Sequence, residues 1–316
     1  MRIAVIGAGV MGTNHARVAG TLPDVELTHV VDADAERAAA AASAHGAVAA
    51  TDPLSVIGQV DAAIVALPTL LHAEVAVPLL EQGIHCLVEK PIAGSVADGE
   101  RIIAAAASGG AVLAVGHVER FNPAMIEAEK FVDGPIHIET ARVGPFSSRV
   151  ADSVVTDLMI HDLDLVRSLA AGELASVAAI AQRVRTDTED LATALVRFDS
   201  DVSASLTASR LGQQKSRTIG ITQHDSYLHV DLMRQEVTIQ RLEHVEYTGS
   251  EGTVYRQRGV VEIPMIETRG EPLWLEQREF LDAAREGRAP KVSGRDGLEA
   301  LRMALAVVDA CRPETA

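Results

Sequence analysis

The chain begins with the stretch Arg2-Ile-Ala-Val-Ile-Gly-Ala-Gly-Val-Met-Gly12, a short apolar run followed by three glycines spaced G-x-G-x-x-G. Residues 14–19 then have a helical pattern. A buried strand, this spacing and a helix form the dinucleotide-binding fingerprint, because the glycines permit a tight turn, the approach of a pyrophosphate and close packing of helix on strand. The helix N-terminus favours the anion. We therefore expect cofactor contacts from Gly7, Gly9, Val10, Met11 and Gly12.

A carboxylate after the second expected strand indicates which dinucleotide is bound. Residues 27–31 are expected to form a second strand, and Asp32 follows it, about 20 residues after the last glycine, as the fingerprint requires. A carboxylate at this position accepts hydrogen bonds from the ribose hydroxyls and repels a 2′-phosphate. The sequence therefore predicts NAD in preference to NADP. The alternative is a glycine turn in another kind of α/β protein, with Asp32 capping a helix.

Composition narrows the class of protein. The 316 residues are enough for two domains. A net charge of -16 argues against non-specific nucleic-acid binding, which depends on clustered lysine and arginine. Cys86 and Cys311 provide neither a disulfide framework nor a thiolate metal site. With no apolar run long enough for a membrane span and no visible signal peptide, we expect a cytoplasmic enzyme without nucleic-acid or membrane partners.

The pattern of apolar residues differs between two parts of the chain. Up to about residue 120, near-continuous apolar runs alternate with helical patterns, as in a parallel sheet covered on both faces. The further strands are expected at 62–67, 85–88 and 111–115, and the helices at 72–83 and 95–108. From about residue 135 the pattern has period two, which indicates an antiparallel sheet with one covered face; its strands include 136–142, 191–198, 202–208 and 227–232. Helices are expected at about 274–286 and 294–310.

These patterns predict an α/β fold with two domains. Residues 1–120 form an NAD(P)-binding Rossmann domain with a doubly wound parallel sheet. Residues 121–316 form a second domain with a mostly antiparallel sheet. The last helices can pack back on the Rossmann domain.

Two motifs carry the groups needed for alcohol chemistry. Val88-Glu-Lys-Pro-Ile92 places Lys90 where an apolar strand ends. Asp157 and His161 are four residues apart, on one face of an expected helix. Lysine, histidine and aspartate can together remove the proton of an alcohol while a cofactor accepts the hydride. The alternatives without a catalytic role are a solvated lysine at Lys90 and a polar pair on the surface of a helix at Asp157 and His161.

A metal site is not expected beside these residues. Asp157, His161, Asp162 and Asp164 offer oxygen and nitrogen ligands, but positions 161, 162 and 164 of a helix do not share a face. The chain also has no H-E-x-x-H motif.

Together these motifs resemble the Gfo/Idh/MocA oxidoreductases, a family named for glucose–fructose oxidoreductase and inositol dehydrogenase. The resemblance covers essentially the whole chain, through the glycine fingerprint, Leu67-Pro68-Thr69 with His72, Glu89-Lys90-Pro91, Gly116-His117, Asp157-x-x-x-His161 and residues 271–280. It implies NAD(P)-linked oxidation or reduction of a sugar or cyclitol. It also implies that residues 121–316 are a substrate and oligomerisation domain with a large open sheet, whose outer face forms dimers or tetramers. It also implies cofactor contacts from Pro68, Thr69, His72, Glu89 and Lys90.

The resemblance also implies roles for the catalytic residues. His161 matches the position of the general base, and an imidazole pKa near ~6.5 suits that task. Asp157 would fix the imidazole tautomer, and Lys90 would bind the reacting oxygen and stabilise alkoxide charge. The reverse division, with Lys90 as base, remains open.

Within the family, residues 116–123, 144–149 and 157–164 resemble nucleotide-sugar dehydrogenases, most of all UDP-N-acetylglucosamine 3-dehydrogenases. Besides the three catalytic residues, a substrate pyrophosphate would be held by Arg120, Asn122, Arg149 and Arg210, although each arginine could instead form a surface ion pair. Two alternatives stay open: an inositol or monosaccharide dehydrogenase, and a non-catalytic NAD-binding regulator. The presence of Lys90, Asp157 and His161 disfavours the regulator.

Overall fold

The computed structural model describes residues 1–147, 152–249 and 252–312, with only the backbone described for 244–249 and 252–257. The chain divides into two compact units. The first comprises Met1–Phe121 with Gly270–Arg302, and the second comprises Asn122–Arg269 with the residues from Met303 onward. Within the described residues, no helix combines the length and the apolar character needed to cross a membrane.

The first unit contains a parallel sheet with the strand order β3-β2-β1-β4-β5-β6. Its strands are β1 Arg2–Ile6, β2 Glu26–Val31, β3 Val48–Ala50, β4 Ala62–Val65, β5 His85–Glu89 and β6 Leu113–Gly116. β4 and β6 are buried at every position, as strands covered on both faces must be. The order reverses between β1 and β4, and this switch point is where ligands bind in such sheets.

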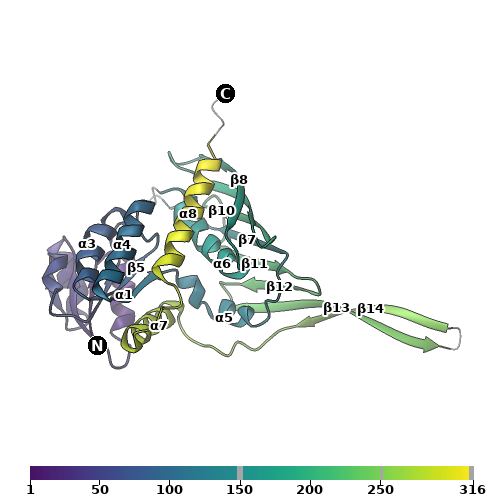
Figure 1. Ribbon diagram of the computed structural model, residues 1–316, viewed down its shortest axis with the longest axis horizontal. Helices are drawn as coiled ribbons and strands as arrows, with labels where there is room; N and C mark the ends of the chain where they lie inside the picture. Colours follow the sequence, from purple (N-terminus) through teal and green to yellow (C-terminus); the bar gives the residue numbers. More distant parts are fainter. Residues whose placement is uncertain (148–151, 250–251, 313–316) are drawn as a thin grey trace. The chain divides into compact units, whose positions relative to one another are not determined.

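Helices alternate with these strands, as Figure 1 shows for α1, α3 and α4. The helices of the unit are α1 Val10–Ala19, α2 Ala35–Ser43, α3 His72–Glu81, α4 Val96–Gly109 and α7 Pro272–Glu286, with short 3-10 turns at η1 Pro53–Val56, η2 Thr69–Leu71 and η3 Val118–Phe121. α8, Gly294–Ala310, begins in the first unit and ends in the second. Alanine, leucine and valine on the inner faces of these helices pack against the sheet and form its core.

The second unit contains a sheet with the order β14-β13-β12-β11-β7-β10-β9-β8. Its strands are β7 His137–Val143, β8 Leu174–Gln182, β9 Leu191–Phe198, β10 Ser203–Ser209, β11 Ser216–Thr222, β12 Ser226–Asp231, β13 Glu236–Gly249 and β14 Gly252–Glu262. β7 and β10 pair in parallel, and the other neighbours pair antiparallel. β13 and β14 form a long hairpin that projects from this sheet (Figure 1).

Helices α5, Pro123–Glu129, and α6, Ile160–Ala170, complete the second unit, and a π-helical turn at Val155–Met159 leads into α6. Burial alternates along β9 and β10 because one face of the sheet is covered and the other is open. The expected α/β fold, with a parallel Rossmann sheet and a large, mostly antiparallel sheet, is confirmed.

Candidate active site

The glycine loop after β1 leaves room for a ligand. Gly7 has a φ of +100°, and a Cβ there would lie 2.3 Å from the carbonyl oxygen of Ala66. A Cβ at Gly12 would lie 1.7 Å from the carbonyl oxygen of Gly7, so both glycines are needed for packing. A Cβ at Gly9 would meet no atom within 4 Å. The open position at Gly9 and the helix N-terminus that no side chain caps fit a pyrophosphate.

Apolar side chains beside this loop are exposed. Val10 is 72% exposed and Met11 is 39% exposed, although both belong to the first turn of α1. The structure therefore places both residues where a bound dinucleotide could cover them.

Asp32 connects the end of β2 to the glycine loop. One carboxylate oxygen accepts a hydrogen bond of 2.8 Å from the Ala8 N–H. The other accepts 2.9 Å bonds from the Asp34 N–H and from the Arg37 guanidinium. Burial opposes ionisation, but these donors outweigh it and lower the pKa of Asp32. The carboxylate is therefore charged at neutral pH, as discrimination against a 2′-phosphate requires.

His72 uses both ring nitrogens within the protein. Nδ1 lies 3.0 Å from the carbonyl oxygen of Pro91, and Nε2 lies 2.9 Å from that of Leu67. Burial lowers the pKa of His72, so the ring is neutral and donates through one nitrogen at a time. The imidazole therefore links the loops that follow β4 and β5. Pro68 and Thr69 precede it on one of these loops, at the start of η2.

Lys90 follows β5, and its backbone is held by a buried polar cluster. The Glu89 carboxylate accepts a 3.1 Å hydrogen bond from the Lys90 N–H, and its other oxygen lies 2.8 Å from Nε2 of His15. Gln277 of α7 donates to Nδ1 of His15 over 2.9 Å. His15 therefore bridges Gln277 and the Glu89 carboxylate through its two ring nitrogens. Burial opposes ionisation of Glu89, but His15 and Lys90 lower the pKa of its carboxyl group.

Glu276 lies beside this cluster and was not identified from the sequence. Its side chain is 1% exposed, and its carboxyl oxygens have no hydrogen-bond partner among the residues that the structure describes. Burial and the nearby Glu89 charge raise the pKa of Glu276 well above its ordinary value. A sequence signal existed, because Glu276 and Gln277 stand within the apolar stripe of α7 that includes Leu273 and Phe280.

In the second unit, Asp157 and His161 lie on either side of a change in helix type. Asp157 belongs to the π-helical turn, whereas His161 is the second residue of α6. The N–H of Ile160 bonds to the Val155 carbonyl, five residues earlier, so the regular α-helix expected across this segment begins only at Ile160. Single π turns are frequent at functional sites.

The face of the sheet behind α6 carries a buried ion pair. Nη2 of Arg142, on β7, lies 2.7 Å from the Asp162 carboxylate of α6, and both side chains are at most 4% exposed. Nε of Arg142 also donates to both Asp162 oxygens over 3.0 Å. Asp162 and Asp164 are thus buried in the unit, and no group of three potential metal-binding side chains occurs within the described part of the chain.

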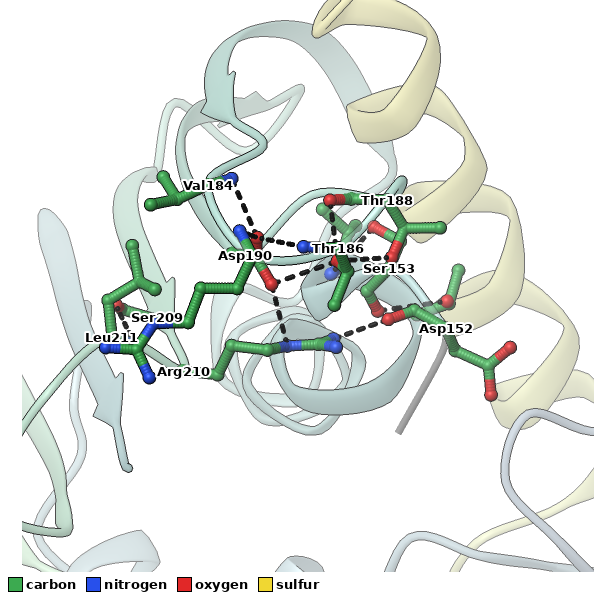
Figure 2. A network of polar contacts seen from close by, with 12 residues as sticks. Asp152, Ser153, Val184, Thr186, Thr188, Asp190, Ser209, Arg210 and Leu211 are labelled. Carbon is green, nitrogen blue, oxygen red and sulfur yellow. Dashed lines mark hydrogen bonds and ion pairs between the residues drawn. The ribbon is translucent and has the colours of Figure 1, made fainter. Parts of the chain in front are cut away.

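Arg210 belongs to a polar network that precedes the Asp157 turn. Figure 2 shows Asp190 and Arg210 facing each other, with Nε of Arg210 3.9 Å from the carboxylate. The same carboxylate accepts backbone N–H groups from residues 184–186, and Arg210 also donates to the Asp152 carbonyl. The Ser153 carbonyl in turn accepts the Asp157 N–H over 2.9 Å. Arg210, expected to bind substrate, therefore also fixes the chain that carries Asp157.

The other expected substrate contacts have different surroundings. Asn122 is 3% exposed and caps α5, because its Oδ1 accepts the Ala124 N–H over 3.1 Å and its Nδ2 donates to the Leu232 carbonyl over 3.0 Å. Arg120 is half-buried in η3. Arg149 lies outside the described residues.

Comparison with known proteins bears on both units. Residues 1–117 match the model of an oxidoreductase family with an NAD-binding Rossmann fold, and residues 123–229 match the GFO/IDH/MocA C-terminal domain. UDP-N-acetylglucosamine 3-dehydrogenase of Acidithiobacillus ferrooxidans is 33% identical over 97% of this chain and 96% of its own. Its solved structure superimposes with a TM-score of 0.87, covering 98% of this chain and 97% of that one at 32% identity. Inositol 2-dehydrogenase 2 of Paenarthrobacter aurescens is 33% identical over 56% of this chain and 58% of its own.

Proposed function

Because the chain belongs to the Gfo/Idh/MocA family of NAD-binding oxidoreductases, we propose that it oxidises a secondary hydroxyl group of a nucleotide sugar. The first candidate substrate is UDP-N-acetylglucosamine, with the C3 hydroxyl converted to a ketone. One observation carries this choice: the relative with that name is 33% identical over 97% of this chain, whereas scyllo-inositol 2-dehydrogenase of Bacillus subtilis, which matches 99% of it, is 27% identical.

Each catalytic residue is proposed to have one task. Bound NAD+ supplies a hydride acceptor. His161 takes the proton of the substrate hydroxyl, and Asp157 orients the imidazole and stabilises its protonated form. Lys90 donates a hydrogen bond to the reacting oxygen and stabilises its developing negative charge. Glu89 supports Lys90, because its carboxylate holds the backbone N–H of that residue.

NAD is the cofactor that fits the first unit. The open position at Gly9 admits a pyrophosphate, and the ionised Asp32 carboxylate suits two free ribose hydroxyls.

We also propose that the enzyme works as a homodimer or homotetramer in the cytoplasm. The open face of the second sheet supports assembly, because it carries the large apolar side chains of Ile180 and Leu195, 70% and 59% exposed. Cys86 and Cys311 are free thiols, as is usual in a reducing compartment.

The proposed reaction is tested by incubating the purified protein with NAD+ and either UDP-N-acetylglucosamine or myo-inositol and following NADH absorbance. We expect turnover of the nucleotide sugar. Lys90→Met should lower kcat about 10²- to 10⁴-fold, as for other positioned acid–base groups, and leave the Kd for NAD+ within a few-fold. Lys130→Met, a change of the same kind at a surface ion pair, is the control. Turnover of myo-inositol alone would contradict the nucleotide-sugar proposal.

A further inference from the structure

A cavity of about 200 Å³ lies within the second unit beside Asp157. It is formed where β7 and β10 end and β11 begins, and its lining includes Arg142, Ser147, Asp157, Arg210, Lys215 and Arg217. Of the lining residues that the structure describes, four are cationic and one, Asp157, is acidic. The chain as a whole has a net charge of -16, so a cavity lined by four cationic side chains differs from the rest of the molecule and indicates a site for an anion.

Two of these arginines oppose each other directly. Arg217 of β11 is the register partner of Arg142 of β7, so both side chains stand on the same face of the sheet. That face is the covered one, because Arg142 is 3% exposed and bonded to Asp162 of α6. Like charges at directly opposite positions destabilise a sheet. The Asp162 carboxylate lies 2.7 Å from Arg142, and an anion bound in the cavity would further lower the repulsion between the two guanidinium groups.

The third cation is held rigidly at the wall of the cavity. Arg210 is 4% exposed, and Asp190 and the Asp152 carbonyl fix its guanidinium in the network of Figure 2. Such anchoring means that little side-chain entropy is lost when a ligand binds.

Lys215 differs from the arginines. It directly precedes β11 and is exposed, and no ion pair or hydrogen bond joins its ammonium group to any other described residue. It can therefore turn toward a ligand, and its substitution removes no hydrogen bond or ion pair with the described residues.

We propose that this cavity binds the phosphoryl group of the substrate, and this inference rests on the proposed nucleotide-sugar oxidation. Guanidinium forks and ammonium groups are the usual partners of phosphate oxygens. The volume is below the roughly 300–1,000 Å³ of a pocket that encloses a whole drug-sized ligand, so it suits one charged group of a larger molecule. Asp157 on the same wall places this group next to the proposed catalytic helix.

The test compares Lys215→Ala, Lys215→Arg and the wild-type enzyme. Lys215→Ala should raise KM for UDP-N-acetylglucosamine about tenfold and change kcat by less than about threefold, because a lost charge-assisted contact weakens binding before it affects chemistry. Lys215→Arg should restore most of the affinity. Arg234→Ala removes one exposed positive charge from the same unit, outside the cavity, and should leave KM unchanged.

Direct binding separates the possible sources of the phosphoryl group. Calorimetric titration of the wild-type enzyme and of Lys215→Ala with UDP, inorganic pyrophosphate and N-acetylglucosamine 1-phosphate should show weaker binding to the variant. A loss for UDP and pyrophosphate alone identifies a diphosphate site, and a loss for the sugar phosphate as well identifies a general phosphoryl site.

The outcomes distinguish this inference from the proposed function. If UDP-N-acetylglucosamine is oxidised and Lys215→Ala leaves KM and UDP binding unchanged, the cavity does not bind the phosphoryl group and the function stands. If only myo-inositol is oxidised while pyrophosphate binding depends on Lys215, the proposed function fails and the anion site stands. If neither turnover of the nucleotide sugar nor Lys215-dependent anion binding is found, both are wrong.

Discussion

At the scale of single residues, Asp32 is expected to decide the choice of cofactor together with Arg37. The Arg37 guanidinium lies 2.9 Å from the Asp32 carboxylate and 3.5 Å from that of Asp34. Asp32→Ser removes the repulsion of a 2′-phosphate and releases Arg37 to bind it. We expect the ratio of kcat/KM for NADP+ to that for NAD+ to rise about tenfold or more, measured by steady-state kinetics.

The double variant Asp32→Ser with Arg37→Gln is the matched control for this prediction. It also lacks the repelling carboxylate but offers no cation, so most of the gain with NADP+ should disappear. An equal gain in both variants would show that Arg37 has no part in the selection.

A second prediction at the residue scale concerns Glu276 and the dependence of the free energy of unfolding on pH. Because its pKa is raised in the folded state, the folded protein binds more protons than the unfolded chain above the ordinary pKa of 4.5. Stability must therefore fall as pH rises from that value, by up to about 1.4 kcal/mol per pH unit for one group. Glu276→Gln is neutral at every pH and of similar shape, so urea unfolding should show its advantage over the wild type increasing between pH 5 and pH 8.

The control for this prediction is Glu271→Gln, at the start of the same helix. Its carboxylate is 46% exposed and pairs with Arg17 at the surface, where ion pairs contribute little. An advantage of Glu276→Gln that stays constant with pH would contradict a neutral buried acid.

The residues that the sequence could identify are those whose neighbours in the chain define them. Asp32 follows a strand and a glycine loop at a fixed distance, so its position could be predicted. Arg142, Lys215 and Arg217 meet only because β7 pairs with β11, a register that no local pattern shows. The cluster of His15, Glu89 and Gln277 was not foreseen because α1, β5 and α7 are far apart in the sequence and meet only in the folded chain.

At the scale of elements, the loop between β8 and β9 depends on one carboxylate. Asp190 accepts N–H groups from residues 184–186 and faces Arg210, and these donors outweigh burial and lower its pKa to about 2. Asp190→Asn should reduce the free energy of unfolding by about 2–4 kcal/mol at pH 7, because a buried guanidinium loses the negative charge that faces it. Asp187→Asn, on the exposed part of this loop, should change it by less than about 0.5 kcal/mol.

The pH dependence of this effect has a defined sign. A carboxyl group whose folded-state pKa is lowered from 3.8 to about 2 stabilises the protein above about pH 4, and this contribution is lost as pH falls toward 2. The difference between the wild type and Asp190→Asn in urea unfolding should therefore shrink between pH 5 and pH 3. A constant difference would mean that the ionised form is not what stabilises the loop.

Elements with strong periodicity could be predicted, and others could not. The helix expected at 294–310 and the strand expected at 191–198 have the same bounds in the structure. The outer part of the β13–β14 hairpin was not singled out, because residues 240–243 and 258–259 are exposed on both faces and burial imposes no alternation there. The π-helical turn was missed because its hydrogen bonds, such as that from the Ile160 N–H to the Val155 carbonyl, are shifted by one residue relative to an α-helix, and no sequence pattern shows that shift.

At the scale of the whole molecule, the open face of the second sheet is expected to hold the subunits together. Ile180 of β8 and Leu195 of β9 point to this face, since their register partners Thr193 and Ala178 place them diagonally across neighbouring strands. Two large apolar side chains that are 70% and 59% exposed are costly in water and favourable in an interface.

Substituting both with glutamate would bury like charges across a symmetric contact, where each subunit presents the same patch. We expect light scattering after gel filtration to show a dimer or tetramer for the wild type and a smaller species for the double variant. Met265→Glu is the control, because it changes another exposed apolar side chain, located after β14. A wild-type monomer, or a double variant of unchanged mass, would contradict assembly through this face.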